Sequence, residues 1–167
     1  MEGLDGVRRG DRDAQERWVA AWWPRVYRMA LALTGHEADA EDLAQETLVA
    51  ALGAVSRFRG GSSEATWLYA ILFHKHRSRA RRLKEERRPP APPREGPVED
   101  ALALLAKLPD AQRITAALFY VEGLSVSEVA RALGVPGPTV RWRLFRARRT
   151  LKRTLDGTRA FQICKEV

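Results

Sequence analysis

The side chains that could bind or react in this sequence are mostly charged, and they gather in stretches of opposite sign. A basic cluster of high density suits a polyanion, and a cationic helix suits the major groove of duplex DNA. The alternative is an ordinary surface helix with solvated arginines. Between positions 139 and 155 there is no acidic residue and there are seven basic ones, namely Arg141, Arg143, Arg146, Arg148, Arg149, Lys152 and Arg153.

The acidic stretch belongs to a helix that we expect to begin among residues 36–39. Carboxylates in its first turns suit the positive end of a helix dipole. Its outward face is either a solubilising surface or a docking surface for a basic partner. That face would carry Asp42, Gln45, Glu46 and Val49, while Leu43, Thr47, Leu48, Ala51, Leu52 and Val55 form the buried side.

No group of residues marks a catalytic centre or a cofactor site. His36 with the neighbouring carboxylates is a loose ligand set, and His74 and His76 point to different helix faces, so we expect no metal. The loop at 57–63 lacks the lysine of a phosphate-binding loop. A single cysteine, Cys164, allows no internal disulfide. We therefore expect no enzyme, no metal and no cofactor.

The basic stretch lies in a predicted helix-turn-helix spanning residues 123–155. Ser125 and Glu128 have the spacing of a capping box, which would start a helix near position 126. Gly134 suits a left-handed turn, and Pro138 can open the next helix. The apolar stripe of that helix consists of Val140, Leu144, Ala147, Leu151 and Leu155.

The N-terminal part predicts three further helices. The first runs from about Asp11 to Leu33, where Gly35 can end it, and the acidic helix follows. Ser62 or Ser63 can cap a third helix that becomes basic from Lys75 onward. Aromatic residues beside this basic helix suggest stacking on unpaired bases, although core spacing favours a structural role for Trp67 and leaves Phe58 open. These aromatic residues are Phe58, Trp67 and Tyr69.

Composition divides the 167-residue chain into two parts with different partners. Residues 1–74 have a net charge of −3 and residues 75–167 a net charge of +11. Four prolines within residues 89–93 favour an extended connector. The fold class is therefore predicted to be all-α, with two small helical domains joined by a Pro-rich linker. No apolar run reaches the roughly 20 residues of a membrane span, and we expect a cytoplasmic protein.

Taken together, these stretches resemble the small bacterial extracytoplasmic-function (ECF) sigma factors of RNA polymerase. DAEDLAQETL at 39–48 is similar to the region 2 helix that docks on the polymerase clamp. FRG at 58–60 and TWLY at 66–69 are similar to the promoter-binding loop and helix that follow. LPDAQR at 108–113, YVEGLS at 120–125 and RAR at 146–148 resemble region 4. The resemblance covers about 10–85 and 100–155.

The resemblance implies an adaptor without catalytic groups that directs core polymerase to promoters, and an anti-sigma factor as a further partner. It implies region 2 at 10–85, a linker at 86–98, region 4 at 99–156 and a tail at 157–167. Polymerase would be bound by Asp39, Asp42, Gln45 and Glu46. Single-stranded −10 DNA would be bound by Phe58, Arg59, Gly60, Ser62, Ser63, His74, Lys75 and Arg79. Duplex −35 DNA would be bound by Thr139, Arg141, Trp142, Phe145, Arg146 and Arg149.

The chain departs from the family pattern at Trp142, which replaces a typically small residue. Three other functions are weighed against a sigma factor. A conventional, polymerase-independent helix-turn-helix regulator would bind a palindromic operator as a dimer. A protein-binding module would use its basic half only for solubility. A small nuclease would need a constellation of metal-binding or acid–base residues, and the sequence shows no convincing one.

Overall fold

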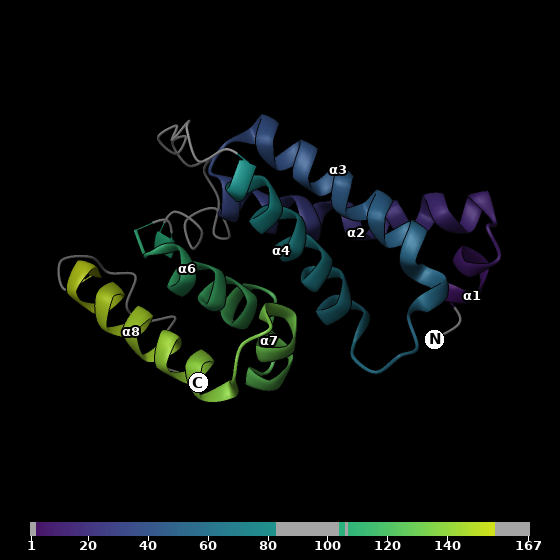
Figure 1. Ribbon diagram of the computed structural model, residues 1–167. Coiled ribbons are helices and arrows are strands. Elements are labelled where there is room, and N and C mark those ends of the chain that lie inside the picture. Colours follow the sequence, from purple (N-terminus) through teal and green to yellow (C-terminus); the bar gives the residue numbers. More distant parts are fainter. Residues whose placement is uncertain (1–2, 83–103, 106, 156–167) are drawn as a thin grey trace. The chain divides into compact units, whose positions relative to one another are not determined.

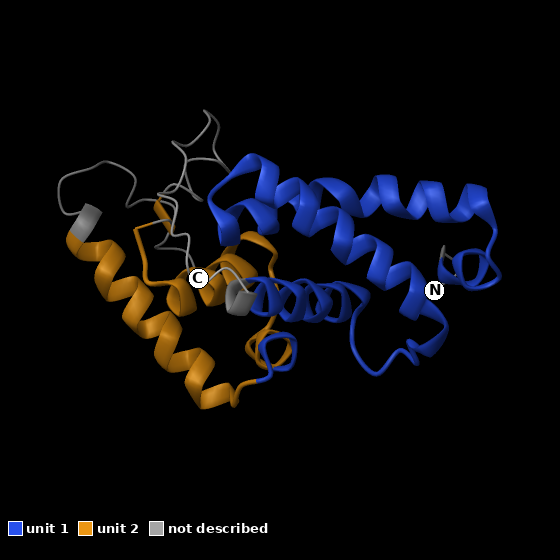
Figure 2. Ribbon diagram, turned by 45° about the horizontal axis from the view of Figure 1, so that its top comes forward, with its two compact units in different colours: residues 1–91, 131–134 blue, residues 92–130, 135–167 orange. Residues whose placement is uncertain are grey.

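The computed structural model describes residues 3–82, 104–105 and 107–155. Within these residues every regular element is helical, which confirms the all-α prediction. The chain falls into two compact units (Figure 2), Met1–Ala91 with Arg131–Gly134, and Pro92–Ala130 with Val135–Val167. The predicted linker at 86–98 and the tail at 157–167, with Cys164, lie outside the described residues.

The first unit contains α1 (Gly3–Arg8), α2 (Arg12–Thr34), α3 (Glu37–Ala54), the short 3-10 helix η1 (Val55–Arg57) and α4 (Glu64–Arg82). Helices α2 and α3 run side by side, and α4 packs mainly on α3 (Figure 1). The core between them is formed by buried apolar side chains, including Val26, Met29, Leu33, Leu43, Leu48, Leu68 and Leu72.

The ends of the helices in this unit follow local sequence signals. Asp11 caps α2 by accepting a hydrogen bond from the backbone N–H of Ala14 at 3.2 Å. Gly35 ends α2 with a φ of 72°, a left-handed conformation that costs glycine little. Helix α3 then begins at Glu37, within the predicted window. These bounds confirm the predicted first and second helices.

Helix α1 was not among the expected elements. Its two buried side chains, Leu4 and Val7, cover the beginning of α2, and α1 also contacts η1. Six residues are too few to form a stable helix alone, so α1 depends on this packing. It is therefore part of the first unit.

The second unit contains α6 (Asp110–Ala116), the π-helical turn η2 (Ala117–Val121) and α8 (Gly137–Leu155), together with the first five residues of α7 (Val126–Leu133), whose last three are assigned to the first unit. Helix α6 packs on α8 (Figure 1). The backbone N–H of Glu128 donates to the Ser125 hydroxyl at 3.3 Å, and the Ser125 N–H donates to the Glu128 carboxylate at 3.0 Å. This reciprocal pair confirms the predicted capping box.

The turn between α7 and α8 is also as predicted. Gly134 has a φ of 64°, and Pro138 lies in the first turn of α8. The stripe residues Val140, Leu144 and Ala147 are buried, and Leu151 is half-buried. The C-terminal half of the described chain is thus a helix-turn-helix with its apolar stripe used for packing.

Candidate functional site

Helix α3 presents a polar, largely acidic surface, which we call the acidic face and define as Asp42, Gln45, Glu46 and Val49. All four side chains are exposed, and Val49 is 64% exposed. The opposite side of the helix is packed, with Leu43, Thr47, Leu48, Ala51 and Val55 buried and Leu52 half-buried. The predicted division of this helix is confirmed.

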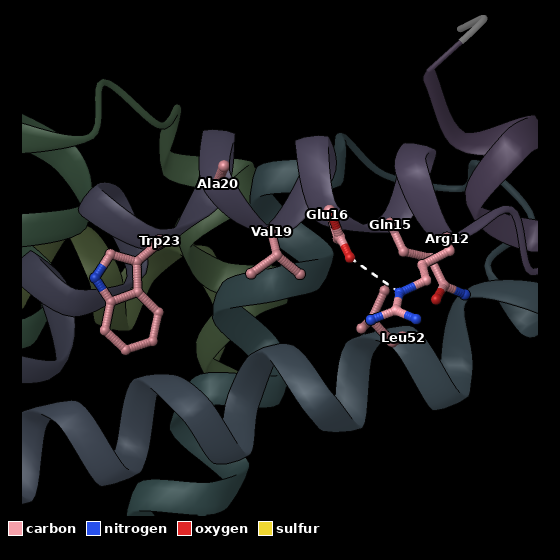
Figure 3. Close-up of a pocket in the computed structure, with 7 residues that line it drawn as sticks. All are labelled: Arg12, Gln15, Glu16, Val19, Ala20, Trp23 and Leu52. Carbon is pink, nitrogen blue, oxygen red and sulfur yellow. Dashed lines mark hydrogen bonds and ion pairs between the residues drawn. The ribbon is translucent and has the colours of Figure 1, made fainter.

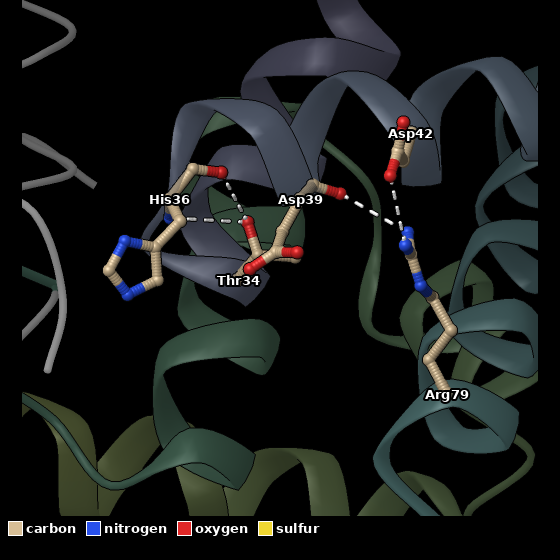
Figure 4. A network of polar contacts seen from close by, with 5 residues as sticks. All are labelled: Thr34, His36, Asp39, Asp42 and Arg79. Carbon is tan, nitrogen blue, oxygen red and sulfur yellow. Dashed lines mark hydrogen bonds and ion pairs between the residues drawn. The ribbon is translucent and has the colours of Figure 1, made fainter. Parts of the chain in front are cut away.

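A network of polar contacts fixes one edge of the acidic face (Figure 4). Arg79 of α4 donates to the Asp42 carboxylate at 3.2 Å and to the backbone carbonyl of Asp39 at 3.3 Å. At the start of α3, the His36 N–H donates to the hydroxyl of Thr34 at 3.4 Å. Asp39 and Asp42, which are predicted to bind polymerase, are thus both hydrogen-bonded to Arg79, which is predicted to bind DNA.

The segment 58–63 is the loop that the resemblance predicts to bind promoter DNA, and we call it the promoter loop for that expected role. Both of its ends are held by hydrogen bonds. Arg8 of α1 donates to the backbone carbonyl of Phe58 at 2.7 Å. The Phe58 ring stacks on Trp67, with ring centroids 4.8 Å apart. Ser63 caps α4 by accepting from the Thr66 N–H at 3.3 Å. Arg59, Gly60 and Ser63 are exposed, and Ser62 is half-buried.

The aromatic residues near this loop are less accessible for stacking on DNA bases than the sequence suggested. Tyr69 is fully buried, so the expectation that it stacks on bases was wrong. Trp67 is half-buried and shares its ring contact with Phe58, in keeping with a structural role. Helical spacing alone did not separate the core-facing Tyr69 from its more accessible neighbours.

Glu64, the first residue of α4, ties that helix to α2. Its Oε1 accepts hydrogen bonds from the indole N–H groups of Trp18 and of Trp22, the latter at 2.6 Å. The Arg25 guanidinium lies 4.6 Å from the Trp22 ring. Sequence analysis missed this contact because it joins residues more than 40 positions apart, and the only local sign was two tryptophans one helical turn apart.

The basic residues of α4 that follow the promoter loop differ in exposure. His74 and Arg77 are exposed, whereas Lys75 is half-buried. Among the residues that the structure describes, no group of three or more His, Cys, Asp or Glu side chains is placed to hold a metal ion. The described helices also include none that is long and apolar enough to cross a membrane.

Helix α8 presents the second candidate surface, which we call the basic face and define as Arg141, Trp142, Phe145, Arg146 and Arg149. All five side chains are exposed, and Thr139 at the beginning of the helix is half-buried. Arg148 is turned toward η2, because its Nε donates to the Tyr120 hydroxyl at 2.5 Å. The structure therefore groups five of the six residues predicted for duplex DNA on one exposed side of α8.

A shallow hollow between α2 and α3 is the third surface feature (Figure 3). Val19, Ala20, Trp23 and Leu52 form its apolar part, and Gln15 also lines it. Arg12 and Glu16 close one end with an ion pair of 3.1 Å. The lining has no arrangement suited to catalysis.

Comparison with known proteins identifies both halves. Residues 18–86 match Sigma-70 region 2, and residues 99–151 match Sigma-70 region 4. The chain is 33% identical to the ECF RNA polymerase sigma factor SigE of Mycolicibacterium smegmatis, over 86% of this chain and 63% of that longer protein. It is 31% identical to the ECF RNA polymerase sigma factor SigM of Mycobacterium tuberculosis, over 87% of this chain and 79% of SigM.

Two solved structures have the same fold. CnrH, in complex with the cytosolic domain of CnrY, gives a TM-score of 0.71 at 27% identity, covering 93% of this chain and 96% of CnrH. The sigma factor RpoE of Bartonella quintana, in complex with the anti-sigma factor NepR, gives 0.68 at 26% identity, covering 86% and 98%.

The matches to regions 2 and 4 identify the protein as a DNA-binding transcription initiation factor. The chain belongs to the sigma-70 family, in its ECF group. As a sigma factor it works with core RNA polymerase and promoter DNA. The family consists of transcription initiation factors and not of enzymes.

Proposed function

We propose that the acidic face of α3 is the surface that binds core RNA polymerase. Asp42, Gln45 and Glu46, with Asp39 at the edge, would contact the clamp helices of the β′ subunit. The proposal is supported by the exposure of these polar groups on a helix whose other side is packed. Arg79 supports it further by holding the Asp42 carboxylate and the Asp39 carbonyl.

The promoter loop and the basic part of α4 would bind the −10 element as a single strand, with one base flipped out of the stack. Arg59, Gly60, Ser62 and Ser63 would contact the strand, and Phe58 would border the base. Flipping a base costs a few kcal/mol, which stacking and backbone charges offset. His74 and Lys75 would contact the strand beyond the loop. Arg79 would contribute to this site indirectly, because its hydrogen bonds to Asp39 and Asp42 join α4 to α3.

The basic face of α8 would bind the −35 element as duplex. Arg141 and Arg146 would meet base edges, where a bidentate arginine–guanine contact contributes roughly 1–3 kcal/mol of discrimination. Trp142 and Phe145 would lie between them, with Thr139 and Arg149 at the two ends of the contact. The single observation that carries the assignment is that exposed faces of opposite character lie on the two segments matched to regions 2 and 4.

The remaining proposals concern the organisation of the whole chain. Region 2 would span 10–85, the linker 86–98, region 4 99–156 and the tail 157–167. CnrH and RpoE were solved with CnrY and with the anti-sigma factor NepR. By that likeness an anti-sigma factor would bind this chain and mask its polymerase-binding surface. The protein would act in the cytoplasm, where polymerase works, and would perform no chemical step itself.

The test is reconstitution with sigma-free core polymerase. The purified protein should co-elute with core polymerase in size exclusion and give new, promoter-specific transcription starts. A folded protein that does not co-elute, but binds duplex DNA alone, would instead indicate the polymerase-independent helix-turn-helix regulator.

Two variants then separate the surfaces. Replacing Asp42 and Glu46 together by Ala should weaken core binding while the circular dichroism spectrum stays helical. Replacing Arg141 and Arg146 together by Glu should leave core binding intact and abolish dependence on the −35 sequence. Unchanged core binding in the first variant would remove α3 from the docking role, and retained −35 dependence in the second would remove α8 from promoter recognition.

A further inference from the structure

Two large aromatic rings lie exposed in the middle of the most basic helix of the protein. Trp142 is 59% exposed and Phe145 is 55% exposed. Both project away from the packed stripe formed by Val140, Leu144 and Ala147, so neither contributes to the core of the unit. Two large apolar side chains exposed three positions apart on one helix form a candidate binding surface.

Each of these rings is paired with an arginine one helical turn later. The Arg146 guanidinium lies 5.7 Å from the Trp142 ring centroid, and that of Arg149 lies 5.8 Å from the Phe145 ring centroid. Both distances are within the range of cation–π contacts. The basic face therefore presents a guanidinium beside each ring, so that apolar and cationic groups lie next to one another.

The charge of α8 identifies the occupant of this surface as duplex DNA. The helix contains seven basic residues and no acidic residue. An apolar protein partner would have to remove these guanidinium groups from water without neutralising them, at considerable cost. A duplex offers phosphates for the cations and a groove for the helix.

The position of the rings places them at the base edges. Trp142 and Phe145 lie in the second and third turns of α8, and the N-terminal part of a recognition helix is the part that contacts bases. The thymine C5-methyl is the apolar group that a base pair presents in the major groove. Side chains of arginine, lysine or asparagine recognise the other, polar groups.

We propose that Trp142 and Phe145 recognise thymine methyl groups in the −35 element. The inference rests on the proposed function of α8. It assigns a specificity that the arginines cannot supply, because a guanidinium does not distinguish a methyl group from hydrogen.

The experiment uses holoenzyme and promoter fragments selected from a library with a randomised −35 region. Each thymine of the selected −35 sequence is replaced in turn by deoxyuracil, which removes the methyl group and keeps base pairing. Loss of one contacted methyl should weaken binding about three- to fivefold, by the free energy of burying one such group. Deoxyuracil at thymines of the spacer between the −10 and −35 elements serves as the control and should have no effect.

The variants Trp142→Ala and Phe145→Ala should each lose sensitivity to deoxyuracil at one or more positions. If either alanine variant fails to fold, Trp142→Gln and Phe145→Gln are the second pair. They also remove the apolar ring, but they place a longer polar side chain on the exposed side of the helix. The wild-type protein alone also tests the proposal, through its binding to promoters with a scrambled or a deoxyuracil-substituted −35 region. A −35 region that matters when scrambled but tolerates every deoxyuracil would overturn the proposal and leave the proposed function intact. A −35 region that does not matter when scrambled would overturn both.

Discussion

The guanidinium of Arg79 on α4 donates to the carboxylate of Asp42 on α3 at 3.2 Å (Figure 4). The same guanidinium reaches the backbone carbonyl of Asp39 at 3.3 Å. Arg79 is 24% exposed and Asp42 64% exposed, so the pair lies at the edge of the acidic face. The helix proposed to bind polymerase and the helix proposed to bind promoter DNA therefore share one ion pair, and a change on one should alter the other.

This coupling can be measured with a double-mutant cycle. Arg79→Ala and Asp42→Ala, alone and together, should show a non-additive effect on the free energy of core polymerase binding. We expect a coupling of about 0.2–1 kcal/mol, the range for ion pairs open to solvent, and a decrease at high salt. Fluorescence anisotropy of labelled protein titrated with core polymerase gives the four affinities.

The matched control combines Arg79→Ala with Gln45→Ala. Gln45 is also on the acidic face but is uncharged, so its effect should add to that of Arg79→Ala. Additivity in both cycles would show that the ion pair has no part in polymerase binding.

The contact of Glu64 with two tryptophans predicts a loss of stability. Glu64→Leu removes the acceptor for the indole N–H of Trp18, whose side chain is only 7% exposed, and for that of Trp22. A buried donor left without an acceptor costs about 1–3 kcal/mol in the free energy of unfolding. Urea denaturation followed by tryptophan fluorescence measures this loss. Glu64→Gln, which keeps an acceptor oxygen, should lose less, and equal midpoints for both variants would contradict the role of the contact.

Two glycines in the helix-turn-helix form a matched pair. A Cβ added at Gly134 or Gly137 would meet no residue beyond the local backbone within 4 Å, but of the two only Gly134 has a positive φ, of 64°. Gly134→Ala should therefore lower the free energy of unfolding by about 1–2 kcal/mol through backbone strain. Gly137→Ala, at the beginning of α8, should be neutral or stabilising by about 0.4–1 kcal/mol. Thermal denaturation measures both, and equal effects would contradict the left-handed turn.

The bond from Arg8 to the Phe58 carbonyl predicts an effect on the promoter loop. Arg8→Ala removes a 2.7 Å hydrogen bond that joins α1 to the start of the loop. Hydrogen exchange of the amides at 58–61 should become about three- to tenfold faster, which corresponds to a hydrogen bond of roughly 1 kcal/mol. The exposed neighbour Arg9 provides the control, and Arg9→Ala should leave exchange in the loop unchanged. Equal exchange in the Arg8 variant and the wild type would show that the bond does not order the loop.

Local signals allowed much of the fold to be predicted. The capping box at Ser125 and Glu128, the turns at Gly35 and Gly134, and the buried stripes of α3 and α8 were all predicted from spacing and are present. These features depend on residues a few positions apart, whose geometry is fixed by the helix itself. The exposed acidic and basic faces follow from the same periodicity.

Other features escaped prediction because they depend on contacts between distant residues. Helix α1 is too short to be recognised by its own pattern and is stabilised by packing on α2. The π-helical turn Ala117–Val121 leaves no periodic signal. Tyr69 and Trp67 have similar sequence surroundings, and only packing shows that Tyr69 is fully buried.

The sequence by itself therefore determined which residues form the two candidate surfaces and what charges they carry. It also indicated the family of the chain. These features depend on periodicity and motif spacing, which involve residues a few positions apart in the same helix. The tertiary structure decided how these residues are held. It bonded Arg79 to α3, joined Glu64 to two tryptophans, and left Trp142 and Phe145 exposed with an arginine near each ring. The bonds of Arg79 and Glu64 span dozens of residues, so chain folding and not local propensity brings their partners together. The exposure of the two rings likewise depends on what the folded chain leaves uncovered.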